Sequence, residues 1–337
     1  MNIIEITEKF PTELDAIKHF ETIRFGETNK CAYCDSVKLS KRSKTDNRFK
    51  CYDCKKSTFV TVNTPLHSTN MDLKKWMFAF SIITDAKKGL SALQLQRNLS
   101  VSYPTALNMY HKIRNLMSIE NNAIQLDGIV EMDETYVGGK PRKFNTGETI
   151  KPEHATVIPE LDERIDELKE AGVSFKRKRG NPAISAENPK RGRGTSKIPV
   201  IGMVERNGNV VAEVSQHVTA FQIKQMVEKY VDTDDSVLIT DTFKGYAKID
   251  TIIENVKIDH QKLYSYKGIN TNSIESFWAI IKRQIIGQHH QVSLKHLPKY
   301  VAEAVFKYNN RNDDDMFETL IKNSMISTTT GEIPNSL

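Results

Sequence analysis

The second half of the chain alternates between apolar and polar residues in several short stretches. In the first, Glu131 would point to one side of a strand and Val130 to the other. Two later runs flank Asn207 and Gly208, a pair typical of a hairpin turn. Strands are expected at residues 128–139, 198–206, 209–215, 236–240 and 256–260. Helices are expected at residues 219–231 and 270–283. This half should therefore form an α/β sheet domain.

Residues 61–125 follow the helical period instead. An apolar stripe begins after Asp72, which we expect to cap the first helix, and Gly89 ends that helix. A short helix at residues 91–98 and a second helix capped by Ser102 flank a tight turn, which predicts a helix-turn-helix. A plain helical hairpin that joins two domains is the alternative interpretation.

The helix expected at residues 270–283 has two different faces. Its apolar residues can pack on a core, whereas Glu275 and Lys282, seven residues apart, share another face that Asn272 joins. A carboxylate, an amide and an ammonium on one face suit a helix that lies beside an active site. The alternative is an ordinary amphipathic helix with an exposed Glu and an exposed Lys.

All four cysteines lie in two CxxC pairs within the first 54 residues. Each pair supplies two thiolates from one tight turn, so together they match a tetrahedral zinc site. The expected ligands are Cys31, Cys34, Cys51 and Cys54. The sixteen residues between the pairs have room for two short strands, which predicts a zinc ribbon. Two redox-active CxxC motifs are the alternative interpretation.

The net charge and the distribution of basic residues indicate which class of partner the chain could bind. The chain has 337 residues and a formal net charge of +6, which permits nucleic acid as a partner. Eight basic and two acidic residues lie between Lys38 and Lys56, together with Phe49 and Tyr52, and this mixture suggests DNA contact. A basic face that only aids solubility is the alternative. No apolar run reaches the ~18 residues of a membrane helix, and no signal-peptide pattern is present, so we expect a cytoplasmic protein.

Residues 140–198 have few apolar side chains, several Pro and Gly, and blocks of charge. We expect a basic, mobile insertion that becomes ordered on DNA, with a passive linker as the alternative. The basic residues expected to contact DNA there are Lys176, Arg177, Lys178, Arg179, Arg191 and Arg193.

Three carboxylates fall where a sheet and a helix could bring them together. Asp133 lies near the end of the first strand, Asp241 ends a later strand, and Glu275 follows on the helix. This is the layout of a ribonuclease-H-like sheet. Two divalent ions about 3.5–4 Å apart would activate the attacking oxygen and stabilise the leaving oxygen of a phosphodiester. Magnesium prefers such carboxylate ligands, and Lys282 would hold a DNA phosphate.

The motifs occur together in a known family. The chain resembles insertion-sequence transposases of the IS1595 family, the type with an ISXO2-like transposase domain, in the stretches CxxC…CxxC, KKGLS, MDETYVGGK, TDTFKGY, NSIESFWAIIKR, GQHH and YNNR. The resemblance implies that Asp133, Asp241 and Glu275 are the acidic triad that binds Mg²⁺ or Mn²⁺. It also implies that Lys282 is the family's lysine that follows the third acidic residue on the same helix. Some family members are described with an asparagine in the third place, so Asn272 is the alternative to Glu275.

Other polar residues near the triad have lesser expected roles. Arg283 and His290 would contact DNA beside Lys282, whereas His260 is expected to be structural. Asn270 departs from related sequences, which tend to have His there, and leaves the triad intact.

The sequence therefore predicts four parts. They are a zinc ribbon at 1–60, a helical DNA-binding or linker domain at 61–125, a ribonuclease-H-like catalytic domain at 126–311 that contains the insertion, and a C-terminal tail at 312–337. By resemblance, the chain is a DDE-type transposase that binds terminal inverted repeats and target DNA as a homo-oligomer, at the nucleoid. Structural zinc and catalytic magnesium or manganese are its expected cofactors. The alternatives are a DNA-binding regulator derived from a transposase and a nuclease of the same fold that cleaves without joining.

Overall fold

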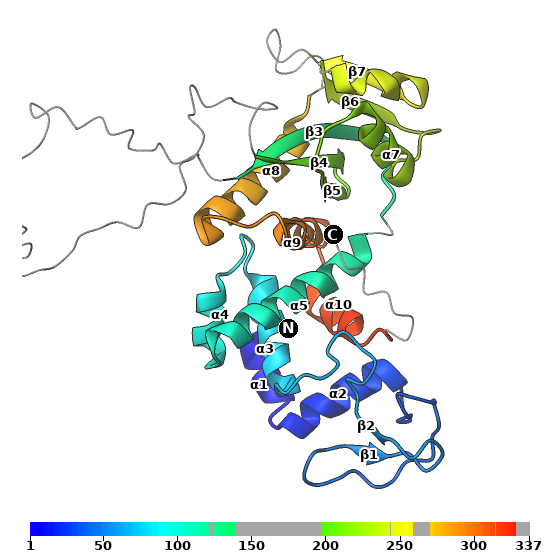
Figure 1. The fold of residues 1–337 in the computed structure, drawn as a ribbon, viewed down its shortest axis with the longest axis vertical. Helices are drawn as coiled ribbons and strands as arrows, with labels where there is room; N and C mark the ends of the chain where they lie inside the picture. The colour runs from blue at the N-terminus through cyan, green and yellow to red at the C-terminus, as the bar shows by residue number, and fades with distance from the viewer. Residues whose placement is uncertain (122–123, 139–196, 243, 259–269, 314, 328–337) are drawn as a thin grey trace, which may run out of the picture. The chain divides into compact units, whose positions relative to one another are not determined.

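Two helices that the apolar pattern does not reveal begin the chain, α1 (Ile3–Lys9) and α2 (Glu13–Phe25) (Figure 1). Each begins with a capping box, formed at Asn2 and at Thr12, in which the N-cap residue and the residue three positions later exchange hydrogen bonds. The two helices bury Ile6 and Phe20. Capping rather than amphipathic pattern therefore marks where they begin.

The segment after α2 contains the expected pair of short strands, β1 (Phe49–Lys50) and β2 (Ser57–Thr58), which pair antiparallel. Leu39 forms an isolated antiparallel bridge with Cys51. Backbone pairing this sparse leaves most of the ribbon without a regular ladder, so its conformation depends on the cysteine cluster described below.

The helices that follow are α3 (Leu73–Asp85), α4 (Ala92–Leu99) and α5 (Tyr103–Asn121). Ser91 caps α4 by accepting a hydrogen bond from the backbone N–H of Gln94, and Ser100 ends it in the left-handed conformation, with φ of 50°. The side chain of Ser102 lies 2.8 Å from the hydroxyl of Thr105 at the start of α5. The predicted pair of helices about a tight turn is confirmed.

The start of α3 differs in detail from the prediction. Asp72 occupies the N-cap position, but its side chain makes no capping hydrogen bond. Glu13 of α2 accepts hydrogen bonds from the backbone N–H groups of Leu73 (2.7 Å) and Lys74 (3.0 Å) instead. Asp72 is thus confirmed as the N-cap residue, but the carboxylate of Glu13 in α2 accepts the hydrogen bonds that a capping side chain would otherwise accept.

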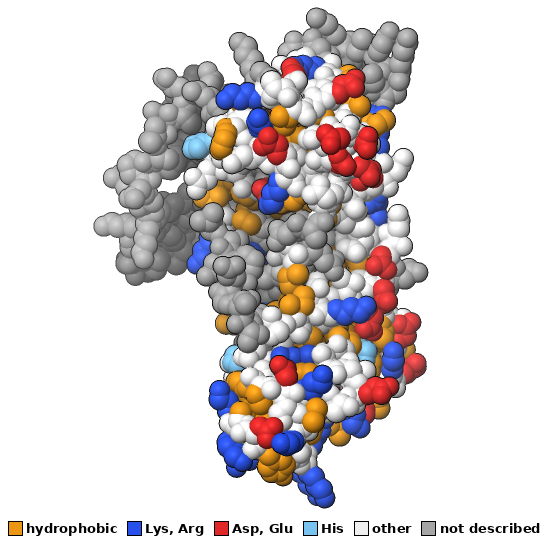
Figure 2. Space-filling model, turned by 90° about the vertical axis from the view of Figure 1, so that its right-hand side faces the viewer, with side chains coloured by type: hydrophobic (Ala, Val, Ile, Leu, Met, Phe, Trp, Pro, Cys, Tyr) orange, Lys and Arg blue, Asp and Glu red, His pale blue; other side chains and the backbone are white. Residues whose placement is uncertain are grey.

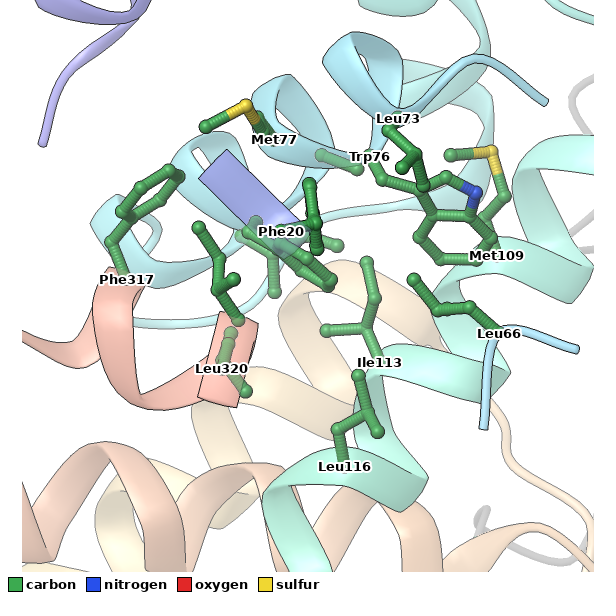
Figure 3. Packing of buried hydrophobic residues seen from close by; sticks show 14 of the residues in the cluster. Phe20, Leu66, Leu73, Trp76, Met77, Met109, Ile113, Leu116, Phe317 and Leu320 are labelled. Atoms are coloured by element: carbon green, nitrogen blue, oxygen red, sulfur yellow. The ribbon is translucent and has the colours of Figure 1, made fainter. Parts of the chain in front are cut away.

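A single core joins these helices to the C-terminal segment. Residues expected to form a tail contain α10 (Met316–Ser324), whose Phe317 and Leu320 are buried. Figure 3 shows Leu320 close to Phe20 of α2 and Ile113 of α5. The described part of the C-terminal segment therefore belongs to the helical core.

The α/β half is a five-stranded sheet in the order β5-β4-β3-β6-β7. The strands are β3 (Ile129–Val137), β4 (Ile198–Glu205), β5 (Val210–Val214), β6 (Val237–Asp241) and β7 (Glu254–Ile258). β3, β4 and β5 pair antiparallel, whereas β6 runs parallel to β3 and β7 parallel to β6. Asn207, with φ of 63°, forms the predicted hairpin turn between β4 and β5. This order and direction of strands is that of a ribonuclease-H-like fold.

Helices cover both faces of the sheet (Figure 1). On one face, Val130 and Met132 of β3 pack against α7 (Ala220–Tyr230) and the 3₁₀ segment η3 (Lys244–Thr251). On the other face, Val200 and Val204 of β4 pack against α8 (Asn272–Gln284) and α9 (Leu297–Asn309). A π-helical turn, η4 (Ile285–His289), follows α8 directly. Residues of β3 with odd numbers therefore face α8.

The computed structural model describes residues 1–121, 124–138, 197–242, 244–258, 270–313 and 315–327. They belong to one compact unit, Met1–Gly138 with Lys197–Leu337. The predicted mobile insertion, its six named basic residues and His260 lie outside the described residues. No helix within the described ranges is both long enough and apolar enough to cross a membrane.

Candidate active site and zinc site

The two aspartates of the predicted triad lie on adjacent strands at the centre of the sheet. The parallel register of β3 and β6 pairs Glu131 with Ile239. Two residues further along the same register, Asp133 lies beside Asp241, and both side chains leave the face that carries α8. Asp133 and Asp241 are each partly buried. The structure therefore brings these two predicted carboxylates together.

Trp278 of α8 holds Asp133 in place. Its indole Nε1–H donates a hydrogen bond to Oδ2 of Asp133 at 3.1 Å. The indole lies over Gly202, which pairs with Asp133 across β3 and β4. A Cβ on Gly202 would lie 2.5 Å from Cη2 of Trp278. Gly202 thus provides the space that lets a helix side chain reach the carboxylate, a role that the sequence analysis did not find.

Burial and neighbouring charge change the acidity of Asp133. Desolvation, followed by repulsion from the carboxylates of Glu134 and Asp241, raises the pKa of Asp133 from its ordinary value of 3.8 to about 7. The hydrogen bond from Trp278 acts in the opposite direction. Negative charge is thus concentrated where it is costly, and a bound cation would relieve that cost.

The remaining predicted residues of the site lie on α8. Glu275 is exposed in its first turn and accepts a hydrogen bond from the hydroxyl of Thr271 at 3.3 Å. Trp278 is three residues after Glu275 and four before Lys282, so the three side chains form one row along the helix. Asn272 and Lys282 are also exposed. The row places Glu275 and Lys282 on either side of the indole that contacts Asp133.

The acidic side chains do not close into one ligand set. Within the described ranges, one group of three or more possible ligands lies close enough together to share a metal ion. It consists of the four cysteines. Asp133, Asp241 and Glu275 form no such group there.

A buried carboxylate that sequence analysis did not assign fixes the start of α8. Glu131 accepts hydrogen bonds from the backbone N–H groups of Ser273 (2.8 Å) and Ile274 (3.2 Å) and from Nε of Arg206 (2.9 Å). Arg206 also donates to the carbonyl of Asn270 at 2.9 Å. An anion at a helix N-terminus is stabilising. The signal in the sequence was an acidic residue on the inward face of a strand otherwise expected to be buried.

The neighbouring acid, Glu134, belongs to the other face of the sheet. Its carboxylate accepts a hydrogen bond at 2.7 Å from the hydroxyl of Tyr246, which is fully buried in η3. Adjacent residues of a strand point to opposite faces. This arrangement confirms that Asp133 and Glu134 face opposite sides, and it gives the Tyr of the TDTFKGY motif a structural role.

The four cysteines form a metal-binding cluster. Cys31 and Cys54 have their Sγ atoms 3.6 Å apart, and Cys34 and Cys51 have theirs 3.7 Å apart. All four sulfurs lie within 4.8 Å of one another. A tetrahedral zinc ion with Zn–S bonds of about 2.3 Å requires sulfurs about 3.8 Å apart. The cluster therefore fits zinc.

The two CxxC turns have the same geometry. The residue after each pair, Asp35 in one and Lys55 in the other, is left-handed, with φ of 56° and 63°. This bend directs backbone N–H groups toward sulfur: hydrogen bonds from the N–H groups of Cys54 and Asp53 favour the thiolate of Cys51, and one from Ser36 favours that of Cys34. Thiolates are the form that binds zinc.

The predicted DNA contacts near α8 differ in exposure. Arg283 and His290 are exposed, and His290 lies at the end of η4. His289 instead packs edge-on against Tyr300, with ring centroids 4.6 Å apart, and burial lowers its pKa to about 4. His290 is thus the more exposed histidine of this pair.

Two family models match the chain. The transposase zinc-ribbon domain matches residues 11–57, and the ISXO2-like transposase domain of the IS1595 type matches residues 167–309. The chain belongs to the IS1595 family of transposases. The first match contains all four cysteines, so the cluster is the structural zinc site of this transposase. The second contains Asp241, Glu275 and Lys282, whereas Asp133 precedes it.

Solved structures add little to this assignment. The transposase is 12% identical to the chain in the crystal structure of a pre-cleavage Mos1 transpososome, over 73% of this chain and 78% of that one, with a TM-score of 0.26. For the Mos1 strand transfer complex the identity is 13%, the coverage 74% and 78%, and the TM-score 0.26. A TM-score this low does not support a fold assignment. The order and direction of the strands support the ribonuclease-H-like fold instead. No curated protein matches the chain.

Proposed function

We propose that this transposase binds the terminal inverted repeats of its element, cuts DNA there and joins the cut ends to target DNA. The observation that carries the proposal is the juxtaposition of Asp133 and Asp241 beneath the helix that carries Glu275 and Lys282. The runner-up functions are a DNA-binding regulator without catalysis and a nuclease that cuts without joining.

The carboxylates of Asp133, Asp241 and Glu275 would hold Mg²⁺ or Mn²⁺, since these ions take oxygen ligands and keep several waters. Bound there, divalent ions supply charge stabilisation at the attacking and leaving oxygens of a phosphodiester. Trp278 orients Asp133, and Lys282, in the last turn of α8, would bind a phosphate of the DNA. Asn272 is the alternative third ligand, because it lies three residues before Glu275 on the same face.

Glu131 and Arg206 act through the position of α8. Their hydrogen bonds tie the first turn of the helix, and the backbone just before it, to the central strand. Glu275 lies in that first turn. A fixed first turn limits how far its carboxylate can move from the two aspartates, as preorganised catalysis requires.

DNA binding is assigned first to the zinc ribbon. Lys and Arg side chains are frequent at the lower end of Figure 2, where the ribbon lies. Tyr52 is 55% exposed, and the ammonium of Lys56 lies 4.7 Å from the ring centroid of Tyr33. Exposed aromatic and basic groups together suit a nucleic-acid surface. We further propose that the transposase works as a homo-oligomer on DNA in the cytoplasm, at the nucleoid.

A strand-transfer assay separates the three functions. The substrate is a labelled duplex with the inverted repeat that flanks the gene, incubated with a supercoiled target plasmid, with and without Mg²⁺. A transposase gives Mg²⁺-dependent cleavage and joined product. Binding without cleavage would indicate the regulator, and cleavage without joining would indicate the nuclease.

The third ligand is decided by two substitutions in the same assay. If Glu275 is the ligand, Glu275→Gln abolishes cleavage and Asn272→Ala has the milder effect. The reverse order assigns the third place to Asn272. Lys282→Ala should weaken productive binding of DNA more than it weakens binding of the divalent ion.

A further inference from the structure

A fully buried ion pair lies between α5 and α9. Nε of Arg114 donates to Oε2 of Glu303 at 2.8 Å, and the two side chains are 1% and 0% exposed. The guanidinium carbon lies 3.6 Å from the ring centroid of Tyr110 and 3.7 Å from that of Tyr300. Arg114 is therefore held between two aromatic rings, one from each side of the contact.

The same network reaches the loop that leads into α4. The hydroxyl of Tyr110 donates to Glu303 at 2.7 Å and accepts from the backbone N–H of Leu90 at 3.1 Å. Nζ of Lys307 donates to Glu303 at 2.7 Å and to the carbonyl of Ala86 at 2.8 Å. Glu303 thus connects α9 with α5 and, through Tyr110 and Lys307, with both ends of the 86–90 loop.

That loop also contacts the catalytic helix. Gly89 has φ of +79°, and a Cβ on it would lie 3.1 Å from the side chain of Gln284, the last residue of α8. α9 in turn packs against β5, at the edge of the sheet that contains Asp133. The helix-turn-helix is therefore joined to the catalytic half at two separate places.

Stability alone does not explain a buried network of this kind. Moving charged groups out of water costs several kcal/mol per ion, and apolar residues of similar size often stabilise a protein equally well or better. Nη2 of Arg114 is buried and has no hydrogen-bond partner among the residues that the structure describes, which adds to that cost. What a charged, directional network provides that apolar contacts do not is a single fixed geometry.

We propose that Arg114 and Glu303 are positioning residues that fix the helix-turn-helix relative to the catalytic sheet. This inference rests on the proposed function. DNA held at the exposed N-terminal end of α5, where Tyr103 and Asn108 are exposed, is thereby presented to Asp133 and Asp241 in one register. Neither Arg114 nor Glu303 touches DNA.

The test replaces the charged triad with apolar residues, Arg114→Met, Glu303→Leu and Lys307→Met together. Spin labels are attached at positions 108 in α5 and 254 in β7, both of which are exposed. The labels react with genetically encoded ketone residues, so the cysteines of the zinc site stay unmodified. The distance between the two labels reports how α5 is positioned relative to β7. We expect a narrow distance distribution in the parent and a broad one in the triple variant at an unchanged melting temperature. An unchanged distribution would overturn the proposal.

Activity gives the second readout. In the triple variant, kcat for cleavage of the end DNA should fall roughly 10- to 100-fold, as expected for a small misplacement of reacting groups, while KM for DNA stays the same. Normal kcat at normal cut positions contradicts the proposal. If the parent itself fails to cleave, the proposed function fails, and the distance measurement still decides the positioning role.

Two further variants complete the design. Lys229→Met with Glu213→Leu removes an exposed ion pair of 3.1 Å between α7 and β5, and should change neither the distance distribution nor kcat. If the triple variant does not fold, Arg114→Lys carries the same test, because it keeps the charge beside Glu303 and removes the planar group between the rings. A parent-like distribution in Arg114→Lys would then refute the positioning role of the stacked guanidinium.

Discussion

Replacing Asp133 with Asn should stabilise the protein at alkaline pH in the absence of divalent cations other than zinc. The carboxyl of Asp133 has a pKa of about 7 in the folded protein against 3.8 ordinarily. Between these pH values the folded state binds the proton that the unfolded chain has lost. The contribution of the Asp133 carboxyl to stability is therefore complete below about pH 4 and is lost as the pH rises through about 7.

The magnitude follows from the two pKa values. A difference of about three corresponds to ~4 kcal/mol, at roughly 1.4 kcal/mol for each tenfold change in the acid constant. Asn has no charge to bury, and its amide oxygen can still accept the hydrogen bond from Trp278. The free energy of unfolding of Asp133→Asn should exceed that of the parent by ~4 kcal/mol at pH 8 and by ~2 kcal/mol at pH 5.5.

Urea unfolding at the two pH values measures this difference. Chelators must be left out, because they would remove zinc from the cysteine cluster. Asp235→Asn, which removes the same charge from an exposed position, is the control and should leave stability nearly unchanged. An equal gain at both pH values, or a loss at pH 8, would refute the reasoning that burial and neighbouring carboxylates oppose ionisation of Asp133.

Three other substitutions test single contacts. Gly202→Ala should destabilise the protein by ~1–3 kcal/mol and slow cleavage, since the added Cβ displaces Trp278. Urea unfolding measures the loss of stability, and the control is Gly287→Ala, whose added Cβ would meet no atom within 4 Å. Glu131→Ala should cost ~3–5 kcal/mol and increase amide exchange in the first turn of α8, because Arg206 loses its buried partner; unchanged exchange would refute the capping role. Cys51→Ser should abolish stoichiometric zinc in metal analysis and increase amide exchange in the ribbon, while exchange in the sheet stays at the parental level.

The elements that the sequence reveals are those whose signal is local. The CxxC pairs, the Asn207 turn and the alternation around Asp133 depend on neighbouring residues, and each is present where expected. The pair of helices about a tight turn can be predicted for the same reason, since Ser91 caps the start of α4 and Ser100 ends it. The α8 row of Glu275 and Lys282 follows from helical periodicity alone.

What the sequence does not reveal depends on contacts between distant residues. Nothing near Asp72 indicates that Glu13, some sixty residues earlier, caps α3. The role of Gly202 follows only once the register places it under Trp278. The buried pair of Arg114 and Glu303 joins residues 189 positions apart. Such partners are determined by tertiary packing, whereas periodicity and capping rules use only residues that are close in the sequence.

The most direct test of the two-aspartate site is the single-turnover rate of strand cleavage in Mg²⁺ for the parent, Asp133→Asn and Asp241→Asn. Each substitution removes a negative ligand with little change in shape, so cleavage should fall by at least ~100-fold. Affinity for the end DNA should be retained, because it comes mainly from basic residues. Cleavage at a near-normal rate in both variants would contradict the account.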